Sequence, residues 1–383
     1  MNKVKLGDIC TVVSGSTPKS GVAEYWNGNI KWITPAEIST DSYIIYDTER
    51  HITEQAVAKT NLTLLPVGTV LLSSRAPIGK TAITGSEMYC NQGFKNLICS
   101  ERIYNKYLYF FLNSRVEHLN ALGRGATFKE ISKGIVEEVE IPLPTLGEQK
   151  YIVEQFEAIQ QLIANRKQAL SILDSLVKSR FIEMFGDPVT NPHGWDKVPL
   201  SDLAEIKIGP FGTLLHKEDY ITGGHALVNP SHIHDGNIVT DGKLTITDEK
   251  YAELSAYHLS ENDVVMGRRG EMGRCAVVKE SGLLCGTGSM IIRSYGEVRA
   301  DFLQKIISFP SFKKTIEDMA VGQTMPNLNV PIVSRLEIIK PPTKVQDDYY
   351  AFVELTDKSK LAVQQSIDTL QTLKDKLMQD YFG

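Results

Sequence analysis

The longest regular pattern of apolar positions in this chain is a spacing of four and three residues, and it occurs twice. Between residues 146 and 186, ten positions follow this spacing, and all are apolar except Arg166 and Arg180. The same positions shifted by 197 recur between residues 343 and 383, with three polar exceptions. A sustained spacing of this kind is typical of helices that pair in a coiled coil. We therefore predict two helices of roughly 38 residues, each about 57 Å long, whose apolar seams pack on one another; the alternative is that each helix packs along its own domain.

Local signals mark where both helices begin and end. Prolines precede each helix, and Thr145 with Glu148 three residues later forms a capping-box pattern. The second copy repeats this signal as Thr343 with Gln346. Each helix would end at a Phe-Gly pair, because glycine readily adopts the left-handed conformation that closes a helix.

The whole chain, and not only its helices, consists of two similar copies that are offset by 194 to 197 residues. Matching segments are residues 6–9 and 200–203, 70–72 and 264–266, 79–83 and 273–277, 125–127 and 322–324, and 185–186 and 382–383. A repeat this long is not a solenoid unit but a complete domain followed by a helix. We predict a first domain at 1–145, a helix at 146–186, a second domain at 187–342 and a helix at 343–383, with pseudo-twofold symmetry.

The two domains have the pattern of short strands mixed with short helices. The apolar runs at 69–73, 97–99 and 136–141 are typical of strands, and the spacing at 104–114 is helical. The predicted fold class is therefore α+β, with two repeated mixed α/β domains separated by two long helices.

Composition restricts the class of protein. The chain has 383 residues, 42% of them apolar and 23% charged, which is typical of globular domains that bury their own cores. No apolar run approaches the roughly 18 residues of a membrane helix, and no export signal is expected, so we predict a cytoplasmic protein. The five cysteines form no C-x-x-C pair, which favours buried, reduced thiols over a disulfide or a metal site.

The charge balance offers no general sign of nucleic-acid binding. The net charge is −5; residues 1–146 carry 15 basic and 14 acidic side chains, and residues 187–342 carry 16 and 20. Proteins that hold DNA alone usually have a basic balance, because phosphate contacts supply much of the affinity. Any DNA-binding surface must therefore be a local patch, and a basic partner would supply further contacts.

Motifs of common enzymes are incomplete or missing. Gly79-Lys80-Thr81 ends like a phosphate-binding loop, but Ser74 stands where that loop needs glycine. The chain contains no Asn-Pro-Pro-aromatic segment of the kind that adenine methyltransferases use. His232 and His234 lack the helical spacing of a metal site, so we interpret them as surface histidines. We predict no catalytic residue, no metal and no cofactor on this chain.

Polar and basic loops occur at matching positions in the two copies. The loop after residues 70–72 is rich in cationic side chains, as is the loop after residues 264–266, yet the side chains differ between them. Arginine is the usual reader of guanine, and asparagine or glutamine of adenine, so loops of this composition fit DNA reading. For any single residue, the alternative is a solvated loop charge. The candidate DNA-binding residues are Ser74, Arg75, Lys80, Asn91, Gln92, Lys95, Arg124, Lys129, Arg268, Arg269, Arg274, Gln323 and Asn327.

Several short motifs stand in a fixed order within this duplicated sequence. They are Gly-Ser-Thr-Pro at 15–18, Tyr-Trp-Asn-Gly-Asn-Ile-Lys-Trp-Ile-Thr-Pro at 25–35, Ser-Arg-Ala-Pro-Ile-Gly at 74–79, Asn-Gln-Gly at 91–93, Ile-Pro-Leu-Pro at 141–144 and Phe-Gly-Asp-Pro at 185–188. In this order the chain resembles the specificity subunits of type I restriction-modification systems over essentially its full length. The second domain departs from the pattern, with Gly-Pro-Phe-Gly at 209–212.

The resemblance implies two target recognition domains joined by antiparallel helices. Each domain would read half of a split sequence in double-stranded DNA through the major groove, and the helices would set the spacing. The helices would also dock two modification subunits, and restriction subunits would join the complex. S-adenosylmethionine and ATP would be bound by those partners, so this chain would be a non-catalytic specificity subunit.

Two other functions fit the residues. A stand-alone DNA-binding regulator would use the same two domains and would bind its site tightly without partners. A scaffold that does not bind DNA would use the paired helices to bind proteins. The matching arginine-rich loops argue against this function.

Overall fold

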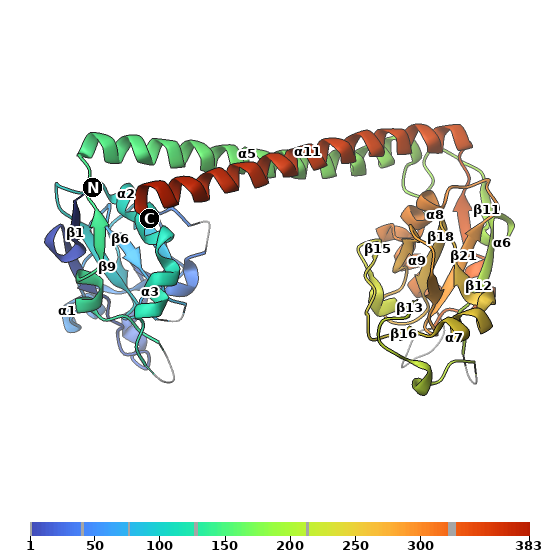
Figure 1. The fold of residues 1–383 in the computed structure, drawn as a ribbon, viewed down its shortest axis with the longest axis horizontal. Coiled ribbons are helices and arrows are strands. Elements are labelled where there is room, and N and C mark those ends of the chain that lie inside the picture. The colour runs from blue at the N-terminus through green and yellow to red at the C-terminus, as the bar shows by residue number, and fades with distance from the viewer. Residues whose placement is uncertain (1, 40–41, 76, 126–128, 212–213, 321–326) are drawn as a thin grey trace. The chain divides into compact units, whose positions relative to one another are not determined.

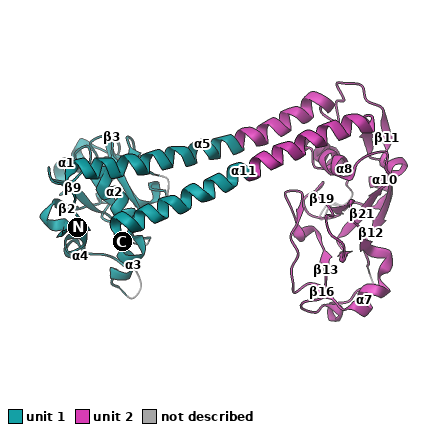
Figure 2. Ribbon diagram, turned by 45° about the horizontal axis from the view of Figure 1, so that its top comes forward, with its two compact units in different colours: residues 1–170, 362–383 teal, residues 171–361 magenta. Residues whose placement is uncertain are grey.

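A computed structural model describes residues 2–39, 42–75, 77–125, 129–211, 214–320 and 327–383, and Figure 1 shows their elements. The chain forms two compact units, shown in separate colours in Figure 2. Unit 1 comprises residues 1–170 and 362–383, and unit 2 comprises residues 171–361. The two long helices predicted from the apolar spacing are present: α5 (Leu146–Phe185) and α11 (Thr343–Phe382) have 40 residues each. Each contributes one end to each unit.

Unit 1 builds its domain from a two-stranded, a five-stranded and a three-stranded sheet, with strand orders β1-β10, β2-β9-β6-β7-β4 and β5-β3-β8. The strands are β1 (Lys3–Lys5), β2 (Cys10–Ser14), β3 (Trp26–Ile33), β4 (Ile44–Ile45), β5 (His51–Ile52), β6 (Val70–Leu72), β7 (Thr81–Thr84), β8 (Tyr89–Cys90), β9 (Lys95–Cys99) and β10 (Glu140–Pro142). The helices are η1 (Leu6–Asp8), η2 (Ala23–Tyr25), η3 (Pro35–Glu37), α1 (Glu54–Lys59), α2 (Asn105–Ser114), α3 (Val116–Leu122) and α4 (Lys133–Glu137).

Unit 2 has the strand orders β11-β22, β12-β21-β18-β19, β16-β13-β20-β17 and β14-β15. Its strands are β11 (Lys197–Pro199), β12 (Ala204–Ile208), β13 (His225–Val228), β14 (Ile233–His234), β15 (Asn237–Ile238), β16 (Thr245–Ile246), β17 (His258–Leu259), β18 (Asp263–Gly267), β19 (Cys275–Val277), β20 (Leu283–Cys285), β21 (Ser289–Ser294) and β22 (Glu337–Ile339). Its helices are α6 (Leu200–Leu203), η5 (Lys217–Asp219), η6 (Pro230–His232), α7 (Asp248–Glu253), η7 (Ser255–Tyr257), α8 (Ala300–Ile307), α9 (Pro310–Met319) and α10 (Val330–Ser334).

The sequence repeat corresponds to a repeat of strand pairing. The order β2-β9-β6-β7 in unit 1 recurs as β12-β21-β18-β19 in unit 2, and the pair β1-β10 recurs as β11-β22. In both units a further sheet contains a parallel pair, β3 with β8 and β13 with β20. The α+β class with two repeated mixed domains is thus confirmed. One local prediction was wrong: residues 136–141 are not one strand, because Ser132 caps the short helix α4 before β10 begins.

The closing ends of both long helices are anchored in the domain cores by phenylalanine. Phe382 of α11 packs in unit 1 against Tyr107 and Phe156, with ring centroids 5.2 and 5.9 Å away. Phe185 of α5 packs in unit 2 against Phe302, at 4.9 Å. The glycine after Phe185 has φ +73°, the left-handed conformation expected of it.

The apolar seams pair the helices within each unit. In unit 1 the beginning of α5 lies with the end of α11, and both Phe156 and Tyr381 belong to the same core. In unit 2 the end of α5 lies with the beginning of α11, where the rings of Phe185 and Tyr349 are 5.4 Å apart. The pairing is therefore antiparallel. Because the helix ends also pack on the domains, the structure combines the two predicted arrangements.

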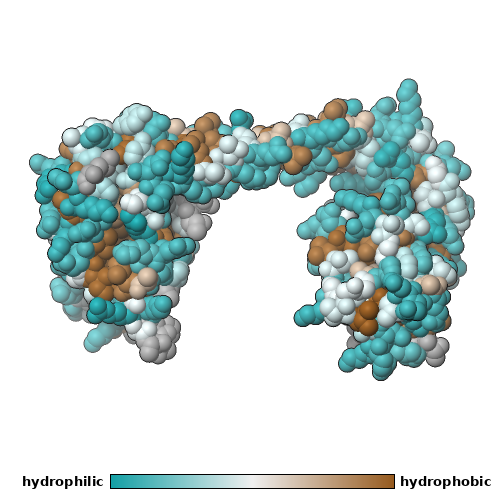
Figure 3. Space-filling model, in the orientation of Figure 1, coloured by the Kyte–Doolittle hydropathy of each residue, from teal (hydrophilic) through white to brown (hydrophobic). Residues whose placement is uncertain are grey.

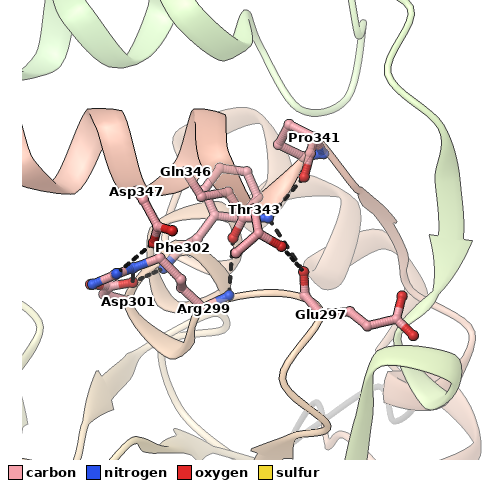
Figure 4. A network of polar contacts seen from close by, with 8 residues as sticks. All are labelled: Glu297, Arg299, Asp301, Phe302, Pro341, Thr343, Gln346 and Asp347. Carbon is pink, nitrogen blue, oxygen red and sulfur yellow. Dashed lines mark hydrogen bonds and ion pairs between the residues drawn. The ribbon is translucent and has the colours of Figure 1, made fainter.

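A buried glutamine ties each helix start to its domain. In unit 1, Gln149 accepts a hydrogen bond from the Tyr104 backbone N–H (2.7 Å) and donates to two backbone carbonyls. In unit 2, Gln346 accepts from the Arg299 N–H (3.0 Å) and donates to the Pro341 carbonyl (2.9 Å), as Figure 4 shows.

This contact corrects the capping prediction for α11. The capping box at the start of α5 is present, because Glu148 accepts from both the backbone N–H and the hydroxyl of Thr145. The predicted box of Thr343 with Gln346 was wrong. Gln346 is the counterpart of Gln149, so its side chain is buried against the domain and does not cap the helix.

Candidate nucleic-acid interface

The loop that follows β6 in unit 1 is held in shape by its own first residue. The Ser73 hydroxyl accepts from the Lys80 N–H (2.9 Å) and donates to the Pro77 carbonyl (2.8 Å). Gly79 has φ +97° and packs against Val116, where a side chain would meet atoms 3.1 Å away. The loop is therefore closed at its base.

Three charged side chains at this loop form what we call the Glu130 cluster: Arg75, Lys95 and Glu130. Arg75 Nε lies 2.9 Å from Glu130 Oε2, and Lys95 Nζ lies 3.2 Å from Glu130 Oε1. Lys95 also donates to the Ser74 hydroxyl at 3.4 Å. The Lys95 side chain is 9% exposed, whereas that of Arg75 is 48% exposed. The cluster thus presents one arginine to solvent over a buried lysine.

Electrostatics keep the Glu130 carboxylate ionised. Its partial burial raises the pKa, but hydrogen bonds and positive charge from Lys95 and Arg75 outweigh this effect and hold the pKa below its ordinary value. Backbone pairing also fixes the position of Glu130, since Glu130 forms antiparallel β-bridges with both Arg75 and Arg124. The structure therefore brings together four predicted residues, Ser74, Arg75, Lys95 and Arg124, around a carboxylate that sequence reasoning missed.

The remaining predicted residues of unit 1 are more dispersed. The Asn91 side chain accepts from the Gly93 N–H of its own loop (2.7 Å) and donates to the hydroxyl of Thr17 in a distant segment (3.0 Å). Thr17 in turn bonds the exposed side chain of Gln92. Lys129 is exposed next to the Glu130 cluster.

The matching loop of unit 2 has the same backbone pairing with different side chains. Arg269 is exposed, and its backbone forms a β-bridge with Asn327, as that of Arg75 does with Glu130. Arg268 is half-buried, and its Nε donates to the Leu328 carbonyl at 3.0 Å. Burial, and then the charge of Arg269, lower the pKa of the Arg268 guanidinium. Gln323, a candidate DNA-binding residue of this region, lies outside the described residues.

A carboxylate also holds two cations in unit 2, in what we call the Glu271 cluster: Glu271, Arg274 and Lys313. Glu271 lies 2.7 Å from Arg274 and 2.9 Å from Lys313. Hydrogen bonds from Lys313, then from Arg274, lower the pKa of the Glu271 carboxyl to about 2. The cluster engages Arg274, the counterpart of Lys80, and not Arg269, the counterpart of Arg75.

Lys80 in unit 1 and Arg274 in unit 2 make equivalent hydrogen bonds that hold their loops. Lys80 Nζ donates to the Pro35 carbonyl at 3.1 Å, and Arg274 Nη1 donates to the Pro230 carbonyl at 3.2 Å. These prolines occupy equivalent turns, η3 and η6. Both cations are therefore partly committed to holding their loops.

Other kinds of site find no support in the described parts of the chain. There, no three His, Cys, Asp or Glu side chains are grouped to hold a metal ion. The interpretation of His232 as a surface residue was wrong: it is buried, and its Nδ1 lies 2.7 Å from the Leu227 carbonyl, while His234 is exposed. Four of the five cysteines are buried, as expected, and Cys99 is half-buried. Among the described helices, none has the length and apolar character needed to cross a membrane.

Comparison with known proteins agrees with this architecture. A chain in a structure of the type I restriction-modification system has a TM-score of 0.70 over 99% of this chain and 97% of its own length, at 16% identity. The S subunit from M. genitalium has a TM-score of 0.53 over 100% and 96%, also at 16% identity. These likenesses establish the fold.

Sequence similarity identifies the family as well as the fold. The MjaIX specificity subunit of Methanocaldococcus jannaschii is 29% identical over 98% of this chain and 90% of its own length. The family model for the type I restriction modification DNA specificity domain matches residues 1–172 and again residues 192–372, one match for each copy of the repeat. Neither a stand-alone regulator nor a scaffold is favoured by these similarities. The chain therefore belongs to the type I restriction-modification specificity family, the component that supplies DNA sequence recognition within the complex.

Proposed function

We propose that each unit reads one half of a bipartite DNA target, and that the chain carries out no chemistry itself. The observation that carries this proposal is the pair of equivalent loops. Their backbones pair in the same way, Arg75 with Glu130 and Arg269 with Asn327, while their side chains differ. One scaffold with two different sets of exposed cations and amides is what two readers of different half-sites require.

The base contacts are assigned to the exposed arginines, Arg75 and Arg269. An arginine can donate two parallel hydrogen bonds to guanine O6 and N7 in the major groove. Lys80 and Arg274 are assigned to loop shape and phosphate contact, because each bonds a proline carbonyl of its own unit. Phosphate contacts position a protein on DNA without reading its sequence.

The long helices are proposed to dock two modification subunits. Large apolar side chains stay exposed along them, and part of this surface is visible in Figure 3. Leu176 on α5 and Leu373 on α11 are equivalent under the repeat, and each is 45% exposed. Exposed apolar surface of this kind marks protein interfaces, and its duplication supports two equivalent partners.

The chemistry of the complex is assigned to those partners in the cytoplasm. Modification subunits would bind S-adenosylmethionine, and restriction subunits would bind ATP. The net charge of −5 supports binding of DNA together with partner subunits, because a chain with a net negative charge would depend on partners for phosphate contacts.

Methylation of a duplex library by this chain together with its modification subunit tests the proposal. With wild-type chain, modified duplexes should share a two-part sequence with a spacer of fixed length. Arg75→Ala should relax one position of one half-site, and Arg269→Ala one position of the other. Each loss should be about 1–3 kcal/mol of discrimination.

Two controls complete this test. The chain without its partner should transfer no methyl group, and it should bind the duplex weakly. If both arginine variants weakened modification equally on every sequence, the loops would be phosphate contacts and the site assignment would be wrong. Methyl transfer by the purified chain alone would contradict a non-catalytic role.

A further inference from the structure

The contact between Arg75 and Glu130 leaves the reading end of the arginine free. Glu130 Oε2 engages only Nε of the guanidinium, at 2.9 Å. The terminal nitrogens Nη1 and Nη2 donate no hydrogen bond to any residue that the structure describes. These two nitrogens can donate side by side to guanine O6 and N7.

The second cation of the cluster holds the carboxylate in place. Lys95 binds the other oxygen of Glu130 at 3.2 Å and is almost fully buried. Backbone hydrogen bonds also fix the Glu130 segment: Glu130 and Arg124 exchange N–H···O bonds of 2.9 and 3.0 Å, and the Ile131 N–H bonds the Ser74 carbonyl at 3.0 Å. Glu130 therefore has few alternative positions, and it restricts Arg75 in turn.

The repeat shows that the carboxylate is not required by the scaffold. Unit 2 keeps the same backbone bridge but has Asn327 at the position of Glu130. Since unit 2 forms the equivalent pairing without a carboxylate, the negative charge of Glu130 is a property of this reader and not of the fold.

We infer that Glu130 is a positioning residue for sequence reading, which orients Arg75 toward one guanine of the half-site read by unit 1. Its negative charge also opposes capture of Arg75 by a DNA phosphate, so it favours discrimination over affinity. This inference rests on the proposed function, because it requires that the loop of unit 1 contacts base edges.

The test compares four single variants, Glu130→Gln, Glu130→Asp, Arg75→Ala and the control Glu138→Gln, each in complex with the modification subunit. Methylation is measured on duplexes in which every base pair of the half-site is varied. Glu138 is a matched control, because it is a carboxylate of the same domain paired with Lys5 at 2.7 Å, outside the reading loops. Melting temperatures of all variants are recorded.

Arg75→Ala should lower the preference for one G·C pair by about 5- to 150-fold. Glu130→Gln should lower the preference at that same pair by about 2- to 10-fold, the value of one hydrogen bond, and leave the other pairs unchanged. Its binding to random duplex should become tighter, with a salt dependence steeper by about one phosphate contact. Glu130→Asp should retain more of the preference than Glu130→Gln, and Glu138→Gln should retain all of it.

The outcomes separate the inference from the function on which it rests. If Glu130→Gln kept the full preference at the pair that depends on Arg75, the inference would be wrong and the proposed function would stand. An equal loss at every pair, accompanied by a lower melting temperature, would show a purely structural role and would also overturn the inference. If Arg75→Ala changed no base preference, the assignment of base contacts to this loop would fail together with the inference.

Discussion

The loops that follow β6 in unit 1 and β18 in unit 2 have one backbone arrangement and two different charge arrangements. In unit 1 the carboxylate is Glu130, and it engages the exposed Arg75. In unit 2 the carboxylate is Glu271, which lies within the loop and engages Arg274 instead. Arg269, the counterpart of Arg75, has no ion pair with any residue that the structure describes. The difference teaches that the shared scaffold fixes where the cations stand, while the position of a single carboxylate determines which of them forms an ion pair.

The shared part of the comparison is equally specific. In unit 1 the Ser74 N–H bonds the Gly93 carbonyl at 2.7 Å, and in unit 2 the Arg268 N–H bonds the Gly288 carbonyl at 2.9 Å. In each unit this bond joins the loop to the short segment between β8 and β9, or between β20 and β21. Side chains can therefore vary between the copies without a change in loop position, and the following predictions test how far this separation extends.

The largest effect is expected from lengthening the helices that both units share. Seven residues inserted between Leu170 and Ser171, and seven between Leu361 and Ala362, fall where the helices pass from one unit to the other. A seven-residue insert keeps the seam on its face and adds about 10 Å, or about three base pairs at 3.4 Å each. We expect the preferred spacer to lengthen by about one to three base pairs, with both half-sites unchanged.

Methylation of a library that varies spacer and half-sites together measures this change. Insertion in one helix only is the control, because it shifts the seams out of register and should reduce activity without a new spacer. An active, folded double insertion with the original spacer would show that the helices do not set the distance.

Removing the phenylalanine at either helix end should destabilise one unit at a time. Phe185→Ala takes a fully buried ring from the core of unit 2, and Phe382→Ala does the same in unit 1. Each should lower the free energy of unfolding of its unit by about 3–5 kcal/mol. Urea unfolding, followed by hydrogen exchange in each unit, gives the measurement. Ile172→Ala, at a side chain that is 59% exposed, is the control and should change stability little. Equal protection losses in both units would contradict the separation into two cores.

Intermediate effects are expected at the two buried glutamines. Gln149→Ala and Gln346→Ala each leave buried backbone groups without a partner, at a cost of about 1–3 kcal/mol. The two losses should be similar, because the contacts are equivalent in the two units. Thermal unfolding checks this, with Gln364→Ala on the exposed face of α11 as the control. A large loss at one glutamine alone would show that the units do not depend on this contact alike.

The smallest effect is expected from the loss of the Glu271 ion pairs at low pH, which should lower folding stability slightly. The Glu271 carboxyl has its pKa lowered from 4.5 to about 2 in the folded chain. A lowered folded pKa adds stability that is complete above the unfolded pKa and is lost as the pH falls from about 4.5 toward 2. Because Glu271 is half exposed, solvent screens the pair and the contribution is small.

The variant Glu271→Gln should therefore melt slightly below wild type at pH 6, and the difference should shrink toward pH 3. Melting temperatures across this range provide the measurement. A difference that stayed constant with pH would mean that the Glu271 ion pairs do not contribute to folding stability.

Much of the architecture was accessible from local patterns in the sequence. The four-three spacing predicted α5 and α11, and the repeat predicted two domains of one topology. The capping residues Thr145 and Glu148 and the closing Gly186 were also recognisable. These features depend on residues within a few positions of one another, or on similarity between the copies, and both are written directly in the chain.

Tertiary structure alone decided which of the candidate cations form ion pairs. Glu130 lies 55 positions from Arg75 and Phe382 lies 275 positions from Tyr107, yet both pairs are in contact. Asn327 was a candidate because its amide could read adenine, and its counterpart Glu130 could have been found by the repeat offset, but the offset does not reveal an ion pair. An ion pair requires two charged atoms to approach within a few ångströms, and that approach follows from how distant segments pack. The sequence thus determined the scaffold and the family, and the packing determined the chemistry presented at the loops.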